Sequence, residues 1–279
     1  MFPRAVAVAF LILLNAGAVP VTPAAADAPA HRIVSLIPSL TEDLFAVGAG
    51  PQVVGVSAYS DAPAAARRLP VISSATAVNA ERVVALHPDV VLGIPSQAPM
   101  VADLRRAGIR VVLAPDDSFD DLFLDLRTAG ALSGHEREAR ALTARLRART
   151  RTLVASIDPR RRRPSIFVVL GDAPIYTVGD GSYVAQLIAL AGGRNASGLR
   201  QPYAPYSAEA LVARQPDALL VQHDLALTPS LHRAPWSSLR AVRAGRVFIV
   251  PDDALLFRPG PRYNDGLAWL ITTLRRLPT

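Results

Sequence analysis

The segment NAERVVALHPDVVL at residues 79–92 returns later in the chain as SAEALVARQPDALL at residues 207–220. Each copy begins with a good helix-capping residue, Asn79 or Ser207, and carries a glutamate in the first helical turn, where the helix dipole favours negative charge. A proline then ends the short helix. The Pro-Asp pair leads into an apolar run that is typical of a buried parallel strand. The segment therefore predicts a helix followed by a strand, once in each half of the chain.

A second pair of segments, residues 107–117 and 244–253, repeats in the same order. Each has a glycine that stops a helix, followed by a strand that ends in Pro-Asp-Asp. The order helix, Pro-Asp, strand is common in α/β proteins, so one repeat alone would be weak evidence. Two repeats in the same order predict two α/β lobes of similar plan with mainly parallel sheets. Ligand sites of such sheets lie at the carboxyl ends of the strands.

The longest predicted helix covers residues 135–157 and joins the two lobes. Its apolar side chains share one face, and arginines occupy the other. At 1.5 Å per residue it would be about 35 Å long, enough to cross both lobes as one rigid backbone. The chain thus divides into a signal peptide (1–26), an N-terminal lobe (32–134), the connecting helix (135–158) and a C-terminal lobe (164–279).

The charge and the N-terminus give opposite indications about partners. The formal net charge is +7, which would normally suggest nucleic acid. However, the N-terminus has Arg4, an apolar run over residues 5–18 and the small-residue run 24–26, a pattern typical of a cleaved signal peptide. An apolar run of about 14 residues is too short to span a bilayer. We therefore expect a periplasmic protein that does not bind nucleic acid.

Catalytic and metal-binding patterns are missing from the sequence. There is no cysteine, which excludes thiolate zinc sites, iron–sulfur clusters and a cysteine-anchored lipoprotein. The five histidines are not paired at metal-ligand spacing, and we interpret Asp116-Asp117 and Asp252-Asp253 as turn and cap residues. The sequence predicts no catalytic residue, no cofactor and no metal site. An exported enzyme that uses the cleft for hydrolysis or metal insertion is the alternative class.

Aromatic and arginine side chains in loops are the candidate ligand-binding residues. Tyr59 follows the predicted strand 53–57, and Tyr203 precedes the second copy of the repeat. The loop FRPGPRY, residues 257–263, holds its arginines and aromatics between prolines and a glycine, which stiffens it. Such a set suits a large, flat, partly anionic ligand. Alternatively, the tyrosines are packing residues and the second arginine caps a turn. The candidates are Tyr59, Tyr203, Phe257, Arg258 and Arg262.

Four segments together resemble the periplasmic binding proteins of ABC importers for cobalamin and iron–siderophore complexes. They are residues 32–42, 55–61, 79–89 and 236–248. The resemblance implies two Rossmann-like lobes, joined by one long rigid helix, that hold the ligand between them and move little on binding.

Within that family, the vitamin B12 binders look most similar, mainly through residues 55–61. This implies that Tyr59, Tyr203 and Arg258 contact a corrinoid. Tryptophans that B12 binders offer near residues 73–76 and 93–96 are absent, as is the tyrosine that haem binders present near Ser74. A ferric siderophore is therefore the next alternative, and haem the third.

The resemblance also implies a docking partner. Glu81 and Glu209 match glutamates with which family members are thought to dock on the two halves of a permease–ATPase complex in the inner membrane. The alternative is that each glutamate only interacts with its own helix dipole. We expect the protein to be a monomer.

Overall fold

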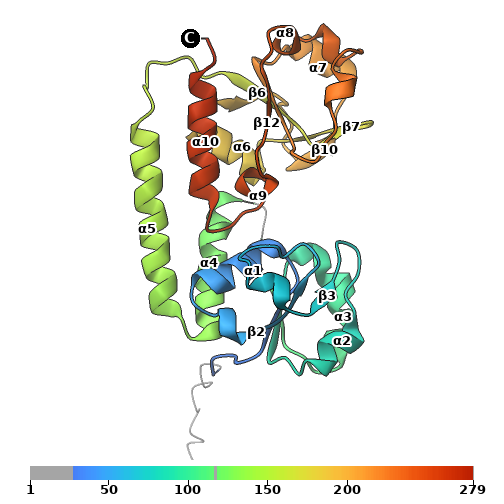
Figure 1. Ribbon diagram of the computed structural model, residues 1–279, viewed down its shortest axis with the longest axis vertical. Coiled ribbons are helices and arrows are strands. Elements are labelled where there is room, and N and C mark those ends of the chain that lie inside the picture. Colours follow the sequence, from blue (N-terminus) through green and yellow to red (C-terminus); the bar gives the residue numbers. More distant parts are fainter. Residues whose placement is uncertain (1–27, 116–117, 279) are drawn as a thin grey trace, which may run out of the picture.

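The computed structural model describes residues 28–115 and 118–278 (Figure 1). The signal peptide predicted over residues 1–26 lies outside the described residues, and so does the pair Asp116-Asp117. Figure 1 shows an N-terminal lobe (blue to green) and a C-terminal lobe (yellow to red), with one long helix alongside both. Within the described ranges, no helix combines the length and the apolar character needed to cross a membrane.

The N-terminal lobe is built on a parallel five-stranded sheet in the order β3-β2-β1-β4-β5. Its strands are β1 (Ile33–Ser35), β2 (Val53–Ser57), β3 (Val71–Ser73), β4 (Val90–Gly93) and β5 (Val111–Leu113). Its helices are α1 (Pro38–Ala46), α2 (Ala80–Ala85), α3 (Ala102–Arg106) and α4 (Phe119–Ser133), with 3-10 turns at Gly50–Gln52, Ala66–Arg68 and Pro95–Val101.

The C-terminal lobe has a parallel four-stranded sheet in the order β12-β11-β6-β9 and a small antiparallel sheet in the order β10-β8-β7. The strands of the parallel sheet are β6 (Ser165–Val169), β9 (Arg194–Asn195), β11 (Ala218–Val221) and β12 (Val247–Ile249), and those of the small sheet are β7 (Gly171–Asp172), β8 (Ile175–Val178) and β10 (Tyr203–Pro205). The helices are α6 (Tyr183–Leu190), α7 (Ala208–Arg214), α8 (Arg240–Arg243), α9 (Asp253–Leu256) and α10 (Tyr263–Arg275), with 3-10 turns at Thr228–Ser230 and Trp236–Ser238. The α/β class with mainly parallel sheets is confirmed.

The repeated segments form α2-β4 in one lobe and α7-β11 in the other. The side chain of Asn79 accepts a hydrogen bond from the backbone N–H of Arg82, and that of Ser207 accepts one from Ala210. Both predicted N-caps are therefore confirmed. Both helices also end next to a residue with positive φ just before the proline, His87 (45°) and Gln215 (43°).

The aspartates of the two Pro-Asp pairs accept equivalent backbone hydrogen bonds in the two lobes. Asp89 accepts hydrogen bonds from the backbone N–H groups of His31 and Arg32, just before the central strand β1. Asp217 accepts one from the backbone N–H of Ser165, at the start of β6, and also pairs with Arg162. Partial burial opposes ionisation, but these hydrogen bonds and the guanidinium of Arg162 lower the pKa of Asp217 to about 2. Each aspartate thus links the start of an inner strand, β1 or β6, to the repeated segment of its lobe.

The predicted connecting helix is α5 (Glu136–Ala155), which is shorter at both ends than expected: its 20 residues span about 30 Å. His135 is the N-cap and Ser156 the C-cap. Leu142 and Leu146 are buried, as the apolar stripe predicted. In Figure 1, α5 (yellow-green) runs along one side of the molecule next to α4 and α10.

The lobes are also joined by side-chain packing, which the sequence did not predict. One continuous hydrophobic cluster contains Leu40 and Leu126 of the N-terminal lobe together with Leu187 and Leu270 of the C-terminal lobe. Aromatic rings make the closest connection: Phe119 on α4 lies 5.0 Å from Tyr263 on α10 and 6.3 Å from Tyr183 on α6, measured between centroids. The joint therefore consists of packed helices and not of a bare linker.

Candidate functional site

A cavity of about 400 Å³ lies between the lobes, at the carboxyl ends of strands from both sheets. This is the position expected for a ligand site in parallel α/β sheets. The N-terminal lobe lines it with residues that follow β2, and the C-terminal lobe with residues that follow β11 and β12. The lining residues are Ala58, Tyr59, Asp61, His223, Asp224, Pro251, Asp252, Asp253, Ala254 and Arg258.

Arg258 and Arg262 are both bound to one buried carboxylate of the opposite lobe. Glu42 on α1 is 5% exposed. Its Oε1 accepts hydrogen bonds from Nη1 of Arg258 and Nη2 of Arg262, and its Oε2 accepts one from Nε of Arg262, all at 2.8 Å. Charge-assisted bonds of this kind are among the strongest in proteins. We call Glu42, Arg258 and Arg262 the inter-lobe ion cluster.

This arrangement changes the expectation for the loop 257–263, whose arginines the sequence analysis directed toward a ligand. A buried carboxylate within reach is a stronger partner than solvent, so both guanidiniums are already engaged. Arg262 lies outside the lining of the inter-lobe cavity, and Phe257 packs partly buried against the main hydrophobic cluster. Arg258 alone combines a place in the ion cluster with a place in the cavity wall.

Arg258 also bonds to the loop that carries Tyr59. Its Nη1 donates to Oδ1 of Asp61 at 2.7 Å. Partial burial would raise the pKa of Asp61, but the hydrogen bond and charge of Arg258 outweigh it and hold that pKa below its ordinary value. Tyr59 itself is 60% exposed, so its ring is available at the cavity wall.

A buried network of hydroxyl groups fixes the start of the Tyr59 loop. Thr41 on α1 donates to Oγ of Ser35 at the end of β1 and shares a 3.0 Å hydrogen bond with Ser60. Ser60 in turn bonds to Ser57 at the end of β2, at 2.9 Å. These residues lie within the family-like segments 32–42 and 55–61, and the network shows why those segments are polar although they are buried.

His223 lines the inter-lobe cavity but is not among the candidate ligand-binding residues from the sequence. Its ring Nδ1 lies 3.0 Å from the carbonyl oxygen of Val250. A carbonyl only accepts, so Nδ1 carries the proton in this hydrogen bond, and the ring orientation is fixed. Its backbone N–H donates to Oδ1 of Asp253. The position of His223 two residues after β11 was the available sequence signal, since ligand sites lie at the carboxyl ends of parallel strands.

Tyr203 is not among the residues that line the inter-lobe cavity. It begins β10, pairs with Val178 of β8 and is 42% exposed. Figure 1 shows β10 on the side of the C-terminal lobe that faces the N-terminal lobe. Tyr59 and Arg258 are therefore brought together at one cavity, and Tyr203 is not part of its lining.

Glu81 and Glu209 occupy the first turns of α2 and α7, as predicted, and both are exposed. The hydroxyl of Ser207 donates to Oε2 of Glu209 at 2.7 Å, which lowers the pKa of that carboxyl. In Figure 1, α2 and α7 lie on the side of the molecule away from α5, one on each lobe.

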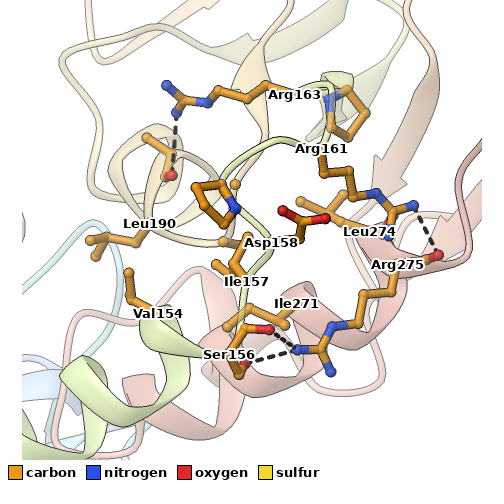
Figure 2. Close-up of a pocket in the computed structure, with 15 residues that line it drawn as sticks. Val154, Ser156, Ile157, Asp158, Arg161, Arg163, Leu190, Ile271, Leu274 and Arg275 are labelled. Atoms are coloured by element: carbon orange, nitrogen blue, oxygen red, sulfur yellow. Dashed lines mark hydrogen bonds between the residues drawn. The ribbon is translucent and has the colours of Figure 1, made fainter. Parts of the chain in front are cut away.

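A second cavity, of about 540 Å³, lies in the C-terminal lobe near the end of α5 (Figure 2). Figure 2 shows three arginines around it, each bonded to a helix end: Arg161 to the carbonyl of Arg275 on α10, Arg163 to that of Ala189 on α6, and Arg275 to Ser156 after α5. These guanidiniums neutralise the negative ends of three helices. We therefore regard this cavity as a structural junction.

The described residues contain no group of three or more histidine, cysteine, aspartate or glutamate side chains placed to hold a metal ion. A buried carboxyl does stand out. Asp43 on α1 is fully buried, and neither of its oxygens has a hydrogen-bond partner among the described residues. Burial, followed by the charges of Asp125 and Glu42, raises its pKa well above the ordinary value.

Comparisons with known proteins agree with this architecture. YvrC, an uncharacterized ABC transporter substrate-binding lipoprotein of Bacillus subtilis strain 168, is 30% identical over 251 residues, covering 87% of this chain and 79% of the relative. The crystal structure of the periplasmic vitamin B12 binding protein BtuF of Vibrio cholerae has a TM-score of 0.77 and 27% identity, covering 88% of this chain and 97% of that one. A periplasmic heme binding protein from Pseudomonas aeruginosa has a TM-score of 0.79 and 29% identity, covering 89% and 94%.

The family profile described as periplasmic binding protein matches residues 33–254, from the first strand of one lobe to the cavity wall of the other. The matched region contains all three sheets, the connecting helix and most of the inter-lobe cavity. On this evidence the chain belongs to the periplasmic binding protein family, the substrate-binding components of ABC importers.

Proposed function

We propose that this protein captures cobalamin or a related corrinoid between its lobes and delivers it to the permease of an ABC importer. The observation that carries the proposal is the inter-lobe cavity, to which the N-terminal lobe contributes Tyr59 and the C-terminal lobe Arg258 and His223. An exposed tyrosine ring offers a stacking face for a flat macrocycle, and a guanidinium binds the polar groups at its edge. The vitamin B12 binding protein among the structural neighbours supports this ligand.

Haem or a ferric siderophore is the alternative ligand, and one contact favours haem. Because Nδ1 of His223 donates to the carbonyl of Val250, the other ring nitrogen is left with no hydrogen bond to the described residues. A histidine held in this way is a good axial ligand for iron. The heme binding neighbour supports this reading of the same cavity.

Absorption spectroscopy separates these ligands. We expect the purified protein to retain cobalamin at one molecule per chain after gel filtration, with the visible spectrum of a corrinoid. Tyr59→Ala removes a stacking contact that contributes about 0.5 to 1.5 kcal/mol beyond area burial, so affinity should fall several-fold. If Tyr59→Ala and Arg258→Ala both bind cobalamin with unchanged affinity, the inter-lobe cavity is not the ligand site. If haem binds instead, His223→Ala should shift its Soret band, because the variant removes the ring nitrogen that would bind the iron.

The protein acts, in this proposal, as a carrier and not as an enzyme. The polar residues that line the inter-lobe cavity include no serine, threonine or cysteine that could serve as a nucleophile next to His223. Incubated cobalamin should therefore be recovered chemically unchanged. A new product in the chromatogram would contradict the carrier role and favour the exported enzyme.

The proposed location is the periplasm, reached through the signal peptide of residues 1–26. The support is the N-terminal pattern of Arg4, an apolar run and a small-residue run, together with the extracytoplasmic relatives. Mass spectrometry of the protein from the host's periplasmic fraction should find a mature chain that begins close to residue 27. An intact N-terminus in the membrane fraction would instead indicate an anchor.

Docking on the permease is proposed for Glu81 and Glu209, one on each lobe. Their equivalent positions in the repeat suit a transporter built from two equivalent halves, where each carboxylate could meet a basic side chain and fix the register. The test is the double variant Glu81→Arg with Glu209→Arg, measured separately for cobalamin binding and for uptake. Intact binding with abolished uptake is expected, and normal uptake would exclude docking through these residues.

A further inference from the structure

A groove of about 350 Å³ runs between α4 and α5, and arginines dominate its walls. Arg127 comes from α4, whereas Arg140, Arg147 and Arg151 come from one side of α5. The groove shares no lining residue with the inter-lobe cavity. Its complete lining is Arg127, Arg140, Thr143, Ala144, Arg147 and Arg151, which we call the arginine groove.

The charges of the arginine groove are not compensated within residues 28–115 and 118–278. None of its four guanidiniums makes a hydrogen bond or an ion pair with these residues; Arg147 only lies over the ring of Phe123, 4.5 Å from its centroid. Elsewhere on α5 the pattern is different, since Arg137 pairs with Glu138 and Arg149 with Asp265. Arg147 and Arg151 are four residues apart on α5, a spacing at which like charges destabilise a helix. The arginine groove is therefore a concentrated positive site that a bound anion would stabilise.

A hydroxyl group in the same groove also lacks a partner. The other two threonines of α5 donate to the carbonyl four residues earlier, Thr150 to Leu146 and Thr152 to Ala148. Thr143 does not, and its Oγ1 is buried without a hydrogen bond to the described residues. A buried hydroxyl without a partner is unfavourable, so a ligand that accepts its proton would be stabilised here. This observation is independent of the charges.

We propose that the arginine groove binds a phosphate-bearing anion. Guanidinium groups bind phosphate through two parallel hydrogen bonds, and the Thr143 hydroxyl supplies a further donor. Four positive charges match a multiply charged anion better than a single carboxylate. The volume, larger than one phosphate needs, suits a diphosphate or a phospholipid headgroup. The site lies on the side of the molecule away from α2 and α7, so it remains open in the proposed docked state.

Calorimetric titration with inorganic pyrophosphate tests the free form of this ligand, in buffer whose ionic strength is held constant with sodium chloride. The groove variant Arg147→Gln with Arg151→Gln should lower the affinity at least tenfold, since it removes two charge-assisted contacts. Thr143→Val keeps the shape and should lower the affinity roughly fivefold. The matched control is Arg145→Gln with Arg160→Gln, which removes the same net charge from exposed positions outside the groove and should bind as the parent chain does.

A second arm distinguishes the source of the phosphate. Cosedimentation is measured with vesicles of phosphatidylcholine alone and with vesicles that contain one-third phosphatidylglycerol. Binding to the anionic vesicles that the groove variant loses and the control keeps would assign a lipid headgroup, and pyrophosphate binding without vesicle binding a soluble phosphate compound. The proposal is overturned if neither probe binds, or if the control variant loses as much affinity as the groove variant.

Discussion

The inter-lobe ion cluster makes a sharp prediction, because its carboxylate is buried and its bonds join the two lobes. Glu42→Gln keeps the shape of the side chain but removes its charge. In the better amide orientation the oxygen takes the place of Oε1 and keeps two guanidinium hydrogen bonds, while the amide nitrogen, a donor, faces the Nε–H of Arg262. The substitution should therefore destabilise the protein without creating a cavity.

The size of the effect follows from the three hydrogen bonds that Glu42 accepts. A hydrogen bond to a charged group contributes about 1.5 to 3 kcal/mol. Glutamine loses one of the three and turns the other two from charge–charge contacts into contacts with a neutral acceptor. Part of this loss is recovered because the Arg258 and Arg262 side chains, 19% and 36% exposed, gain water. We expect the free energy of unfolding to fall by about 3 kcal/mol, at the lower end of the values for breaking buried ion pairs. For a chain of this size that corresponds to a decrease in Tm of roughly 6 to 12 °C.

Urea unfolding followed by circular dichroism measures this change, and Asp61→Asn is the matched control. Asp61 bonds to the same guanidinium, but its side chain is 57% exposed, so its removal should change stability by less than about 1 kcal/mol. The reasoning is refuted if Glu42→Gln unfolds within 0.5 kcal/mol of the parent chain (roughly the measurement error of such comparisons). It is equally refuted if Asp61→Asn costs as much as Glu42→Gln.

Three further predictions concern Asp43, Asp217 and the packed joint between the lobes. The pKa of Asp43 is raised in the folded state, so the folded protein binds the Asp43 proton more tightly than the unfolded chain does. The parent chain should therefore lose stability as the pH rises. Asp43→Asn has no such proton, and between pH 5 and 8 it should lose less stability than the parent chain in urea unfolding. The pKa of Asp217 is lowered to about 2, so its contribution to stability has the opposite dependence on pH. Asp217→Asn should lower the free energy of unfolding by about 1 to 2 kcal/mol at pH 6, and this difference from the parent chain should shrink as the pH falls below 3.8. A difference that stays constant with pH would contradict the assignment. Small-angle scattering profiles with and without ligand should nearly superimpose, since α5 and the packed rings resist bending; a large compaction would show a flexible hinge.

Sequence reasoning succeeded where the information is local. The N-caps of α2 and α7, the stop of each helix before a proline and the apolar strand that follows depend on neighbouring residues, so the repeat exposed them. The apolar stripe of α5 is local in the same sense. The ends of α5 were less accurate because His135 and Ser156 take cap conformations that no periodicity reveals.

The ion cluster could not be predicted, because it joins residues far apart in the chain. Glu42 is 216 residues from Arg258 and 220 from Arg262. Only the way the lobes face each other brings them within hydrogen-bonding distance. A signal existed in retrospect: Glu42 and Asp43 are charged residues on a helix whose central residues are all buried, a position where a carboxylate needs a partner or a proton.

Arg258 links the fold to the proposed function, because one of its two carboxylate partners is buried and the other is exposed at the cavity. Its bond to the buried Glu42 holds the lobes together, whereas Asp61 is largely exposed and lines the cavity. A polar ligand group that reaches Arg258 would compete with the exposed carboxylate and leave the buried one in place, since water can solvate Asp61 but not Glu42. Binding then needs only a shift of the loop that carries Tyr59 and Asp61, while the lobes keep their relative position. An ion cluster of this kind allows a stiff two-lobed protein to exchange one contact for a ligand without opening.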